Sequence, residues 1–188
     1  MIELQVDFDK RKHADIMRKC SLLADGKTIE KAIARAAKRA ADAGKTETKR
    51  QLAAEYTLPP TEIGKTIFTG GSVTGSWMRL RSSPIALTKF KSVTPKGVMP
   101  PAKGPVKAQV KKSGGAELKM AFVAKMKSGH IGVFERKGEK RLPIKELFGP
   151  STTGMFKANE NVNVAVLEKI QETLDKRIEH ELGRILNG

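Results

Sequence analysis

The hydrophobic periodicity of this 188-residue chain changes twice, and the order of these changes limits the fold it can adopt. Residues 28–56 have a helical pattern, with mostly small apolar residues at Ile29, Ile33, Ala36, Ala40 and Ala43. Residues 73–144 read as short extended segments separated by Gly and Pro turns. Helical spacing then returns after Pro150. The order along the chain is helices, then strands, then a helix. This order predicts an α+β fold in which an antiparallel sheet packs against two long amphipathic helices.

Within this order we expect the following elements. The alternation of Ile2, Leu4, Val6 and Phe8 predicts a half-buried strand, and a short helix is expected over residues 10–23. The later strands are expected over residues 73–81, 85–90, 106–112, 119–126, 131–136 and 141–144, with a turn at Ser113–Gly115. The second long helix is expected to bury Leu167, Ile170, Leu174, Ile178, Leu182 and Ile185. We expect three segments, 1–68, 69–149 and 150–188, within one structural domain.

A long Pro-, Gly- and Lys-rich loop interrupts the strands. Residues 92–105 hold four of the nine prolines, and no acid occurs between Lys91 and Lys112. Such a segment forms no regular element, and prolines keep it extended, which suits an arm laid on a neighbouring subunit. The residues predicted to dock a neighbour are Pro95, Lys96, Pro100, Pro101, Lys103 and Pro105.

Charge gives the strongest indication of function. The chain has 36 Lys and Arg against 20 Asp and Glu, and the stretch from Arg79 to Lys145 holds 17 basic and three acidic residues. The electrostatic field of this excess positive charge attracts polyanions, and the attraction weakens as the salt concentration rises. The residues predicted to face nucleic acid are Lys111, Lys112, Arg136, Lys137, Lys140 and Arg141.

The residues of catalytic and metal chemistry do not form recognisable patterns. One cysteine, Cys20, and three histidines lack metal-ligand spacing, and no Gly-rich phosphate loop joins a strand to a helix. Glu117 reads as a solvated loop carboxylate and His130 as a turn residue. We therefore expect a protein that is not an enzyme, with no catalytic, cofactor or metal site. No apolar run reaches the ~20 residues that span a bilayer, which predicts a protein made in the cytoplasm.

One region resembles a known family. From Gly129 to Asn161 a strand leads into the Arg- and Lys-rich hairpin 136–141, then Leu142-Pro143-Ile144, then a Pro150-Ser151-Thr152-Thr153 entry to a helix with an early Phe156. This order resembles the minor tail protein Z family of lambda-like phages and prophages, in which an aromatic residue stands where Leu142 does here. The resemblance extends loosely over residues 27–186.

The resemblance implies a structural virion protein that completes the head-proximal end of a long tail. It implies a ring of copies around the DNA channel that supports head–tail joining and DNA passage. The partners would be other copies, neighbouring tail-terminator, tail-tube or connector proteins, and phage DNA through non-specific phosphate contacts. Neither a membrane nor a small-molecule substrate is expected, and the family carries over no catalytic site.

The residues alone also fit a free nucleic-acid-binding protein, for instance an RNA-binding factor. Readers of single-stranded RNA usually stack bases on aromatic side chains. The basic region offers chiefly Trp77, Phe90, Phe122 and Phe134, and the last two lie in apolar runs where core packing is expected. An enzyme such as a nuclease is the third alternative.

Overall fold

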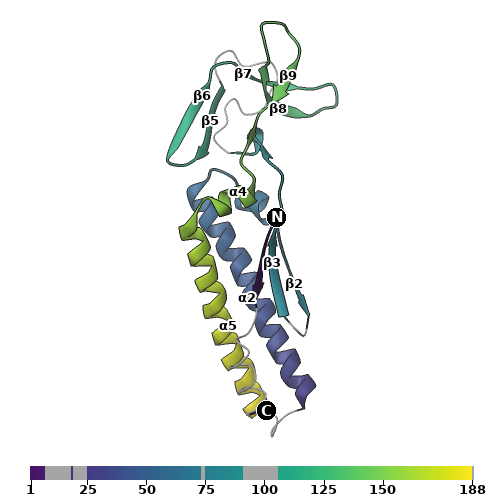
Figure 1. Cartoon of the computed structure of the whole chain (residues 1–188), viewed down its shortest axis with the longest axis vertical. Coiled ribbons are helices and arrows are strands. Elements are labelled where there is room, and N and C mark those ends of the chain that lie inside the picture. Colours follow the sequence, from purple (N-terminus) through teal and green to yellow (C-terminus); the bar gives the residue numbers. More distant parts are fainter. Residues whose placement is uncertain (7–17, 19–24, 73–74, 91–105, 188) are drawn as a thin grey trace. The chain divides into compact units, whose positions relative to one another are not determined.

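A computed structural model describes residues 1–6, 18, 25–72, 75–90 and 106–187 of the chain (Figure 1). The chain divides into two compact units. The helical unit comprises Met1–Lys49, Ile67–Arg81 and Asn159–Gly188, and the hairpin unit comprises Arg50–Thr66 and Ser82–Ala158. The short helix expected over residues 10–23 lies outside the described residues, apart from the helical Arg18.

The helical unit contains one three-stranded sheet and two long helices. Its elements are β1 (Ile2–Val6), α2 (Gly26–Glu55, of which residues 26–49 belong here), β2 (Ile67–Ser72), β3 (Gly75–Leu80) and α5 (Glu160–Asn187). The strands pair antiparallel in the order β1-β3-β2. Ile67, Met78 and Leu80 are buried on one face of this sheet. The predicted first strand and both long helices are therefore confirmed.

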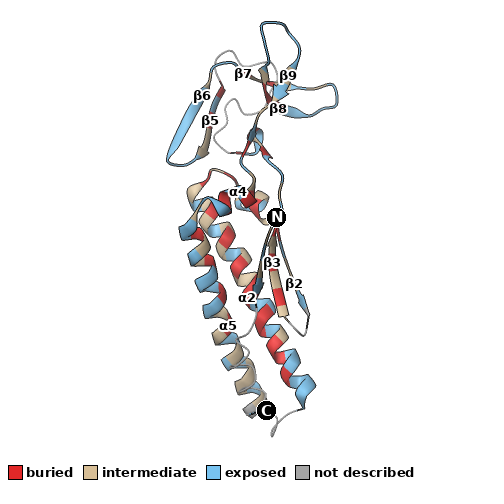
Figure 2. Cartoon of the chain, viewed as in Figure 1, coloured by how far each residue is buried: buried red, intermediate tan, exposed pale blue. Residues whose placement is uncertain are grey.

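Small residues on one face of α2 let both the sheet and α5 approach this helix closely. Ile29, Ile33, Ala36 and Ala40 are buried, as expected, and buried positions run along most of the helix (Figure 2). The closest approach is at Gly44. A Cβ atom there would lie 2.7 Å from the side chain of Ile170 on α5 and 3.4 Å from the sulfur of Met78 on β3.

The buried stripe of α5 differs from the predicted one. Val162, Val166, Ile170 and Leu174 are buried, at steps of four, whereas Leu167 is 51% exposed. The expectation that Leu167 lies in the core is wrong. Steps of three and of four both satisfy a helical period, and the hydrophobicity of Leu167 outweighed that of the two valines in the sequence pattern. Ile178, Leu182 and Ile185 are half-buried.

The hairpin unit holds small sheets rather than one continuous sheet. Three antiparallel arrangements occur, β10-β4, β5-β6 and β7-β8-β9. The elements are α3 (Pro60–Gly64), β4 (Ile85–Ala86), the 3-10 helix η1 (Leu87–Lys89), β5 (Val106–Lys111), β6 (Gly114–Leu118), β7 (Ala121–Lys125), β8 (Ile131–Arg136), β9 (Ile144–Glu146), β10 (Phe148–Gly149) and α4 (Thr152–Lys157). The α+β class is confirmed, and β8 has the predicted bounds.

Several local expectations need correction. Residues 85–90 form a two-residue strand and η1, and Gly114 and Gly115, expected in a turn, begin strand β6. Residues 67–72, not predicted as extended, form β2. The second helical region is interrupted. Ser151 caps α4 by accepting the N–H of Gly154 at 3.0 Å, and Asn159 accepts the N–H of Val162 at 3.3 Å at the start of α5.

We expect the Gly44→Val variant to unfold more easily than the parent, because its side chain would enter space already filled by Ile170 and Met78. Overpacking of this kind costs about 1–3 kcal/mol. Ala54→Val, on an exposed position of the same helix, is the control. Urea denaturation followed by circular dichroism gives the comparison, and equal midpoints for the two variants would contradict the close approach at Gly44.

A second matched pair tests the buried stripe of α5. Ile170→Asp places a carboxylate at a buried position and should cost about 3 kcal/mol or more. Leu167→Asp, three residues away and exposed, should leave the free energy of unfolding within about 0.5 kcal/mol of the parent. Both are measured at a dilution that keeps the chain monomeric. Equal losses in the two variants would restore Leu167 to the core face.

Candidate nucleic-acid interface

An exposed basic segment runs from the last residue of β8 into the connection to β9, over residues Arg136–Arg141, which we call the basic hairpin. All six residues are exposed. The connection is closed by pairing of Arg136 with Ile144 and by the N–H of Lys137, which donates to the carbonyl of Pro143 at 3.0 Å. Four of its residues are basic and Glu139 is its one acid. The hairpin thus presents cations on a backbone fixed at its base.

The cations of the basic hairpin are available to a partner. In the described part of the chain, no carboxylate lies within 4.0 Å of the charged nitrogens of Arg136, Lys137, Lys140 or Arg141. The guanidinium carbon of Arg136 lies 5.5 Å from the ring centroid of Phe122, a cation–π contact that orients the side chain and leaves its N–H donors free.

The other two predicted residues, Lys111 and Lys112, belong to a different sheet. The ammonium of Lys111 lies 3.3 Å from the Glu55 carboxylate and 5.7 Å from the ring of Tyr56. Burial raises the pKa of the Tyr56 hydroxyl, so this ring stays neutral at physiological pH. The backbone N–H of Lys112 donates to the carbonyl of Glu55 at 2.8 Å, while its side chain is exposed. Lys111 therefore positions β5, and Lys112 is the better-placed cation.

Two further cations were missed by the sequence reasoning. Lys125 and Lys127 are exposed at the turn between β7 and β8, in the same sheet as the basic hairpin but at the opposite strand ends. Gly129 turns the chain here with φ of +86°, a conformation that favours glycine. His130 Nε2 lies 2.8 Å from the Glu146 carboxylate. Two lysines immediately before the Ser128-Gly129 turn are the signal that would have identified this second tip.

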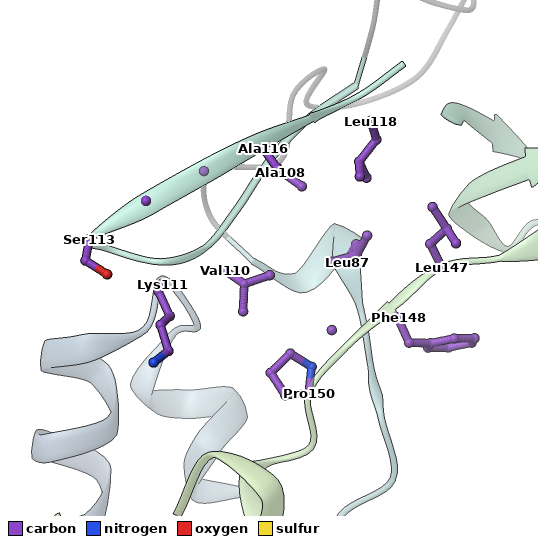
Figure 3. A pocket seen from close by; sticks show the side chains of 13 residues that line it. Leu87, Ala108, Val110, Lys111, Ser113, Ala116, Leu118, Leu147, Phe148 and Pro150 are labelled. Carbon is purple, nitrogen blue, oxygen red and sulfur yellow. The ribbon is translucent and has the colours of Figure 1, made fainter. Parts of the chain in front are cut away.

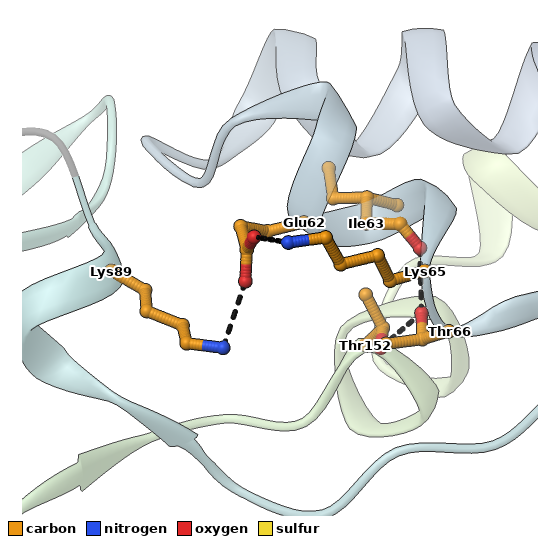
Figure 4. A network of polar contacts seen from close by, with 6 residues as sticks. All are labelled: Glu62, Ile63, Lys65, Thr66, Lys89 and Thr152. Atoms are coloured by element: carbon orange, nitrogen blue, oxygen red, sulfur yellow. Dashed lines mark hydrogen bonds and ion pairs between the residues drawn. The ribbon is translucent and has the colours of Figure 1, made fainter.

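Not every cation of the basic middle region is free. Glu62 on α3 contacts Lys65, with Lys89 on η1 2.8 Å away on its other side (Figure 4). Hydrogen bonds from Lys65 and Lys89 hold the pKa of the Glu62 carboxyl below its usual value. In the same region Thr152 on α4 donates a hydrogen bond to Thr66 at 2.8 Å (Figure 4). Lys89 therefore serves the structure of the hairpin unit.

The residues predicted to dock a neighbour, from Pro95 to Pro105, lie outside the described residues.

An apolar cavity of about 610 Å³ lies between the β5–β6 hairpin and residues 147–150 (Figure 3). Leu87, Val110, Leu118, Leu147 and Phe148 contribute to its lining. Lys111 is the only titratable residue among those that line it. Among the described residues that line it, no second acid or base accompanies Lys111, so these residues do not form the pair of groups that general acid–base catalysis requires.

The described residues contain no group of three or more His, Cys, Asp or Glu placed to hold a metal ion. None of the described helices is long and apolar enough to cross a membrane.

Comparison with known proteins identifies the class. The description of the matching family model is prophage minor tail protein Z (GPZ), and the match covers residues 18–187. The chain is thus a structural tail protein of a phage or prophage, of a family not known for enzymatic activity. It belongs to the prophage minor tail protein Z family. No curated protein and no solved structure matches the chain.

The ion pairs of Glu62 generate a pH prediction. A carboxyl group whose pKa is lowered by folding stabilises the folded protein at pH values above the pKa of the unfolded state, about 4.5. This stabilisation is lost as the pH falls through the lower pKa of the folded state. Glu62→Gln should therefore lower stability at pH 7 by up to about 1 kcal/mol and converge with the parent at low pH. Urea midpoints from pH 7 to pH 3 give the comparison, and a constant difference would contradict the role of Glu62.

Proposed function

We propose that this protein is a tail-completion subunit that forms a ring at the head-proximal end of a long phage tail. In this ring the basic hairpins face the DNA channel, and the assembly supports head–tail joining and DNA passage. The partners would be other copies, neighbouring tail or connector proteins, and DNA. Membership of the minor tail protein Z family supports a place in the tail, and the distribution of charge supports the orientation toward DNA.

The segregation of charge between the two units carries this proposal. The hairpin unit holds 18 Lys and Arg against 6 Asp and Glu, a net charge of +12. The helical unit holds 18 against 14, a net charge of +4. Solubility alone does not require that the positive charge be concentrated in one unit. Binding close to a polyanion does favour such a concentration, because the positive charge attracts the polyanion.

The kind of contact follows from the side chains. Exposed Lys and Arg on hairpin tips bind phosphates and carry no information about base sequence. A channel through which DNA must move also requires contacts that do not hold particular bases. Phosphate contacts exchange quickly with counterions and weaken with salt, so they suit passage better than base readout.

We expect DNA binding to become less dependent on salt when the basic hairpin is neutralised. The test variant combines Arg136→Gln, Lys137→Gln, Lys140→Gln and Arg141→Gln, and Kd for duplex DNA is measured from 50 to 300 mM salt. The slope of log K against log salt should become shallower by about 0.9 for each phosphate that the variant no longer neutralises.

A second variant controls for net charge. Lys27→Gln, Lys31→Gln, Lys38→Gln and Arg39→Gln remove the same number of charges from exposed positions of α2. This control should change the slope less than the hairpin variant does. Equal slopes for the two variants would mean that net charge alone governs binding and that the basic hairpin does not face DNA.

The ring is tested separately by gel filtration with light scattering of the parent chain. A closed oligomer of defined mass, alone or on isolated tails, supports the proposal. A chain that stays monomeric under both conditions while it binds DNA favours the alternative of a free nucleic-acid-binding protein.

A further inference from the structure

The outer face of the β1-β3-β2 sheet carries an aromatic and cationic cluster that no described residue covers. Residues directly opposite each other on paired strands lie on the same face of a sheet. One row on this face consists of Glu3, Arg79 and Phe68. The next row consists of Gln5, Trp77 and Gly70. These side chains lie on the face opposite the buried Met78 and Leu80. Phe68 is 49% exposed. We call Phe68, Trp77 and Arg79 the sheet patch.

Contacts inside the sheet position Trp77 and Arg79 of the sheet patch. The Trp77 indole lies so close to Gly70 that a Cβ atom there would be 2.5 Å from the ring. The guanidinium carbon of Arg79 lies 4.6 Å from the centroid of the same indole, and its Nη2 lies 2.8 Å from the Glu3 carboxylate. Rigid Trp, Phe and Arg side chains are the types that dominate binding energy at protein interfaces, because little entropy is lost when they bind.

The same contacts argue against nucleic acid as the occupant of this face. Surfaces that bind single strands combine several free aromatic rings with free cations, but the indole already contacts Gly70 and Arg79, which leaves the half-exposed Phe68 as the open ring of the patch. A phosphate would require a free cation, but Glu3 pairs with the Arg79 guanidinium. The occupant expected on the sheet patch is therefore a protein surface.

A complementary surface occurs on the first half of α5. Val164 and Leu167 are 49% and 51% exposed, one helical turn apart. Glu160 and Glu168 flank them, both exposed, and no ion pair to either occurs among the described residues. The whole of α5 carries six acids and four bases, whereas residues 67–81 carry two arginines and no acid. We call Val164, Leu167 and Glu168 the helix patch.

The two patches are different surfaces of one unit: the sheet patch lies on the face away from the buried Met78 and Leu80, and the helix patch lies beside the buried stripe of α5. A symmetric dimer would place like patch on like patch. Contacts between two different patches instead join copies head to tail, and such contacts close into a ring when the rotation per copy allows it.

We propose that the sheet patch of one copy packs on the helix patch of the next copy. Phe68 and Trp77 meet Val164 and Leu167, while Arg81, which is exposed and has no ion pair among the described residues, faces the Glu168 carboxylate of the other copy. This inference rests on the proposed ring, for which it supplies the interface.

Cross-linking between two differently marked copies tests this interface. In a Cys20→Ser background, one preparation carries Phe68→Cys and another carries Leu167→Cys, and a short bis-maleimide is added to each alone and to their mixture. We expect cross-linked dimers in the mixture and little product from either preparation alone. Strong cross-linking of Phe68→Cys to itself, or no product in a mixture that light scattering shows to be oligomeric, would overturn the interface but not the ring.

Affinity supplies an independent readout. Phe68→Asp and Leu167→Lys should each raise the Kd for self-association at least about tenfold, because each puts a like charge against the opposing patch. Both positions are half-exposed, so circular dichroism spectra and thermal melting of the monomer should match the parent. Met120→Lys, at an exposed apolar residue of the hairpin unit, is the control and should leave assembly unchanged. Equal effects of all three variants would overturn the proposal, and a parent that never self-associates would overturn the ring together with its interface.

Discussion

The close packing against the small-residue face of α2 is the contact on which the helical unit depends. Ala36, Ala40 and Gly44 allow β3, through Met78, and α5, through Ile170, to pack together on this face of the helix. Larger side chains would push both layers outward, and dispersion contacts fall off steeply with distance. The joint packing of the sheet, α2 and α5 follows from these contacts.

The hairpin unit is constrained by charge more than by packing. It has too few carboxylates for its cations, and four of the six already serve internal pairs: Glu55 with Lys111, Glu62 with Lys65 and Lys89, Glu117 with Lys107, and Glu146 with His130. The remaining cations repel one another, which works against a compact state. A bound polyanion would relieve this repulsion and stabilise the unit by mass action. We infer that this property suits a protein whose working place is next to DNA.

Periodicity was enough to predict the elements with strong local signals. The two long helices could be read from apolar residues that recur at steps of three and four, and β8 from the Gly turns on either side of it. For elements with weaker patterns, the expectation that glycine marks a turn was wrong. Gly70 and Gly115 resemble turn residues in the sequence, yet both lie in strands, and Gly70 leaves room for the Trp77 indole across the sheet. Such a role depends on a residue on another strand and leaves no local signal.

The candidate site was predictable in kind but not in detail. Composition identified the basic hairpin, because four cations with one acid at a turn are visible in any window of the sequence. The partner of Lys111 was not visible, since Glu55 is distant in the chain and is brought near only by folding. The outward position of Leu167 was missed for a related reason, because two overlapping helical stripes shared Ile170 and Leu174 and only packing selects between them.

The central claim is that the hairpin unit of this tail protein faces DNA in the finished particle. Formaldehyde cross-linking of intact virions, followed by mass spectrometry of DNA-linked peptides, tests it most directly. If the hairpin unit faces DNA, we expect DNA-linked peptides that contain Lys137 or Lys140. Virions that contain the chain but yield DNA-linked peptides only from the helical unit, or none at all, would contradict the claim.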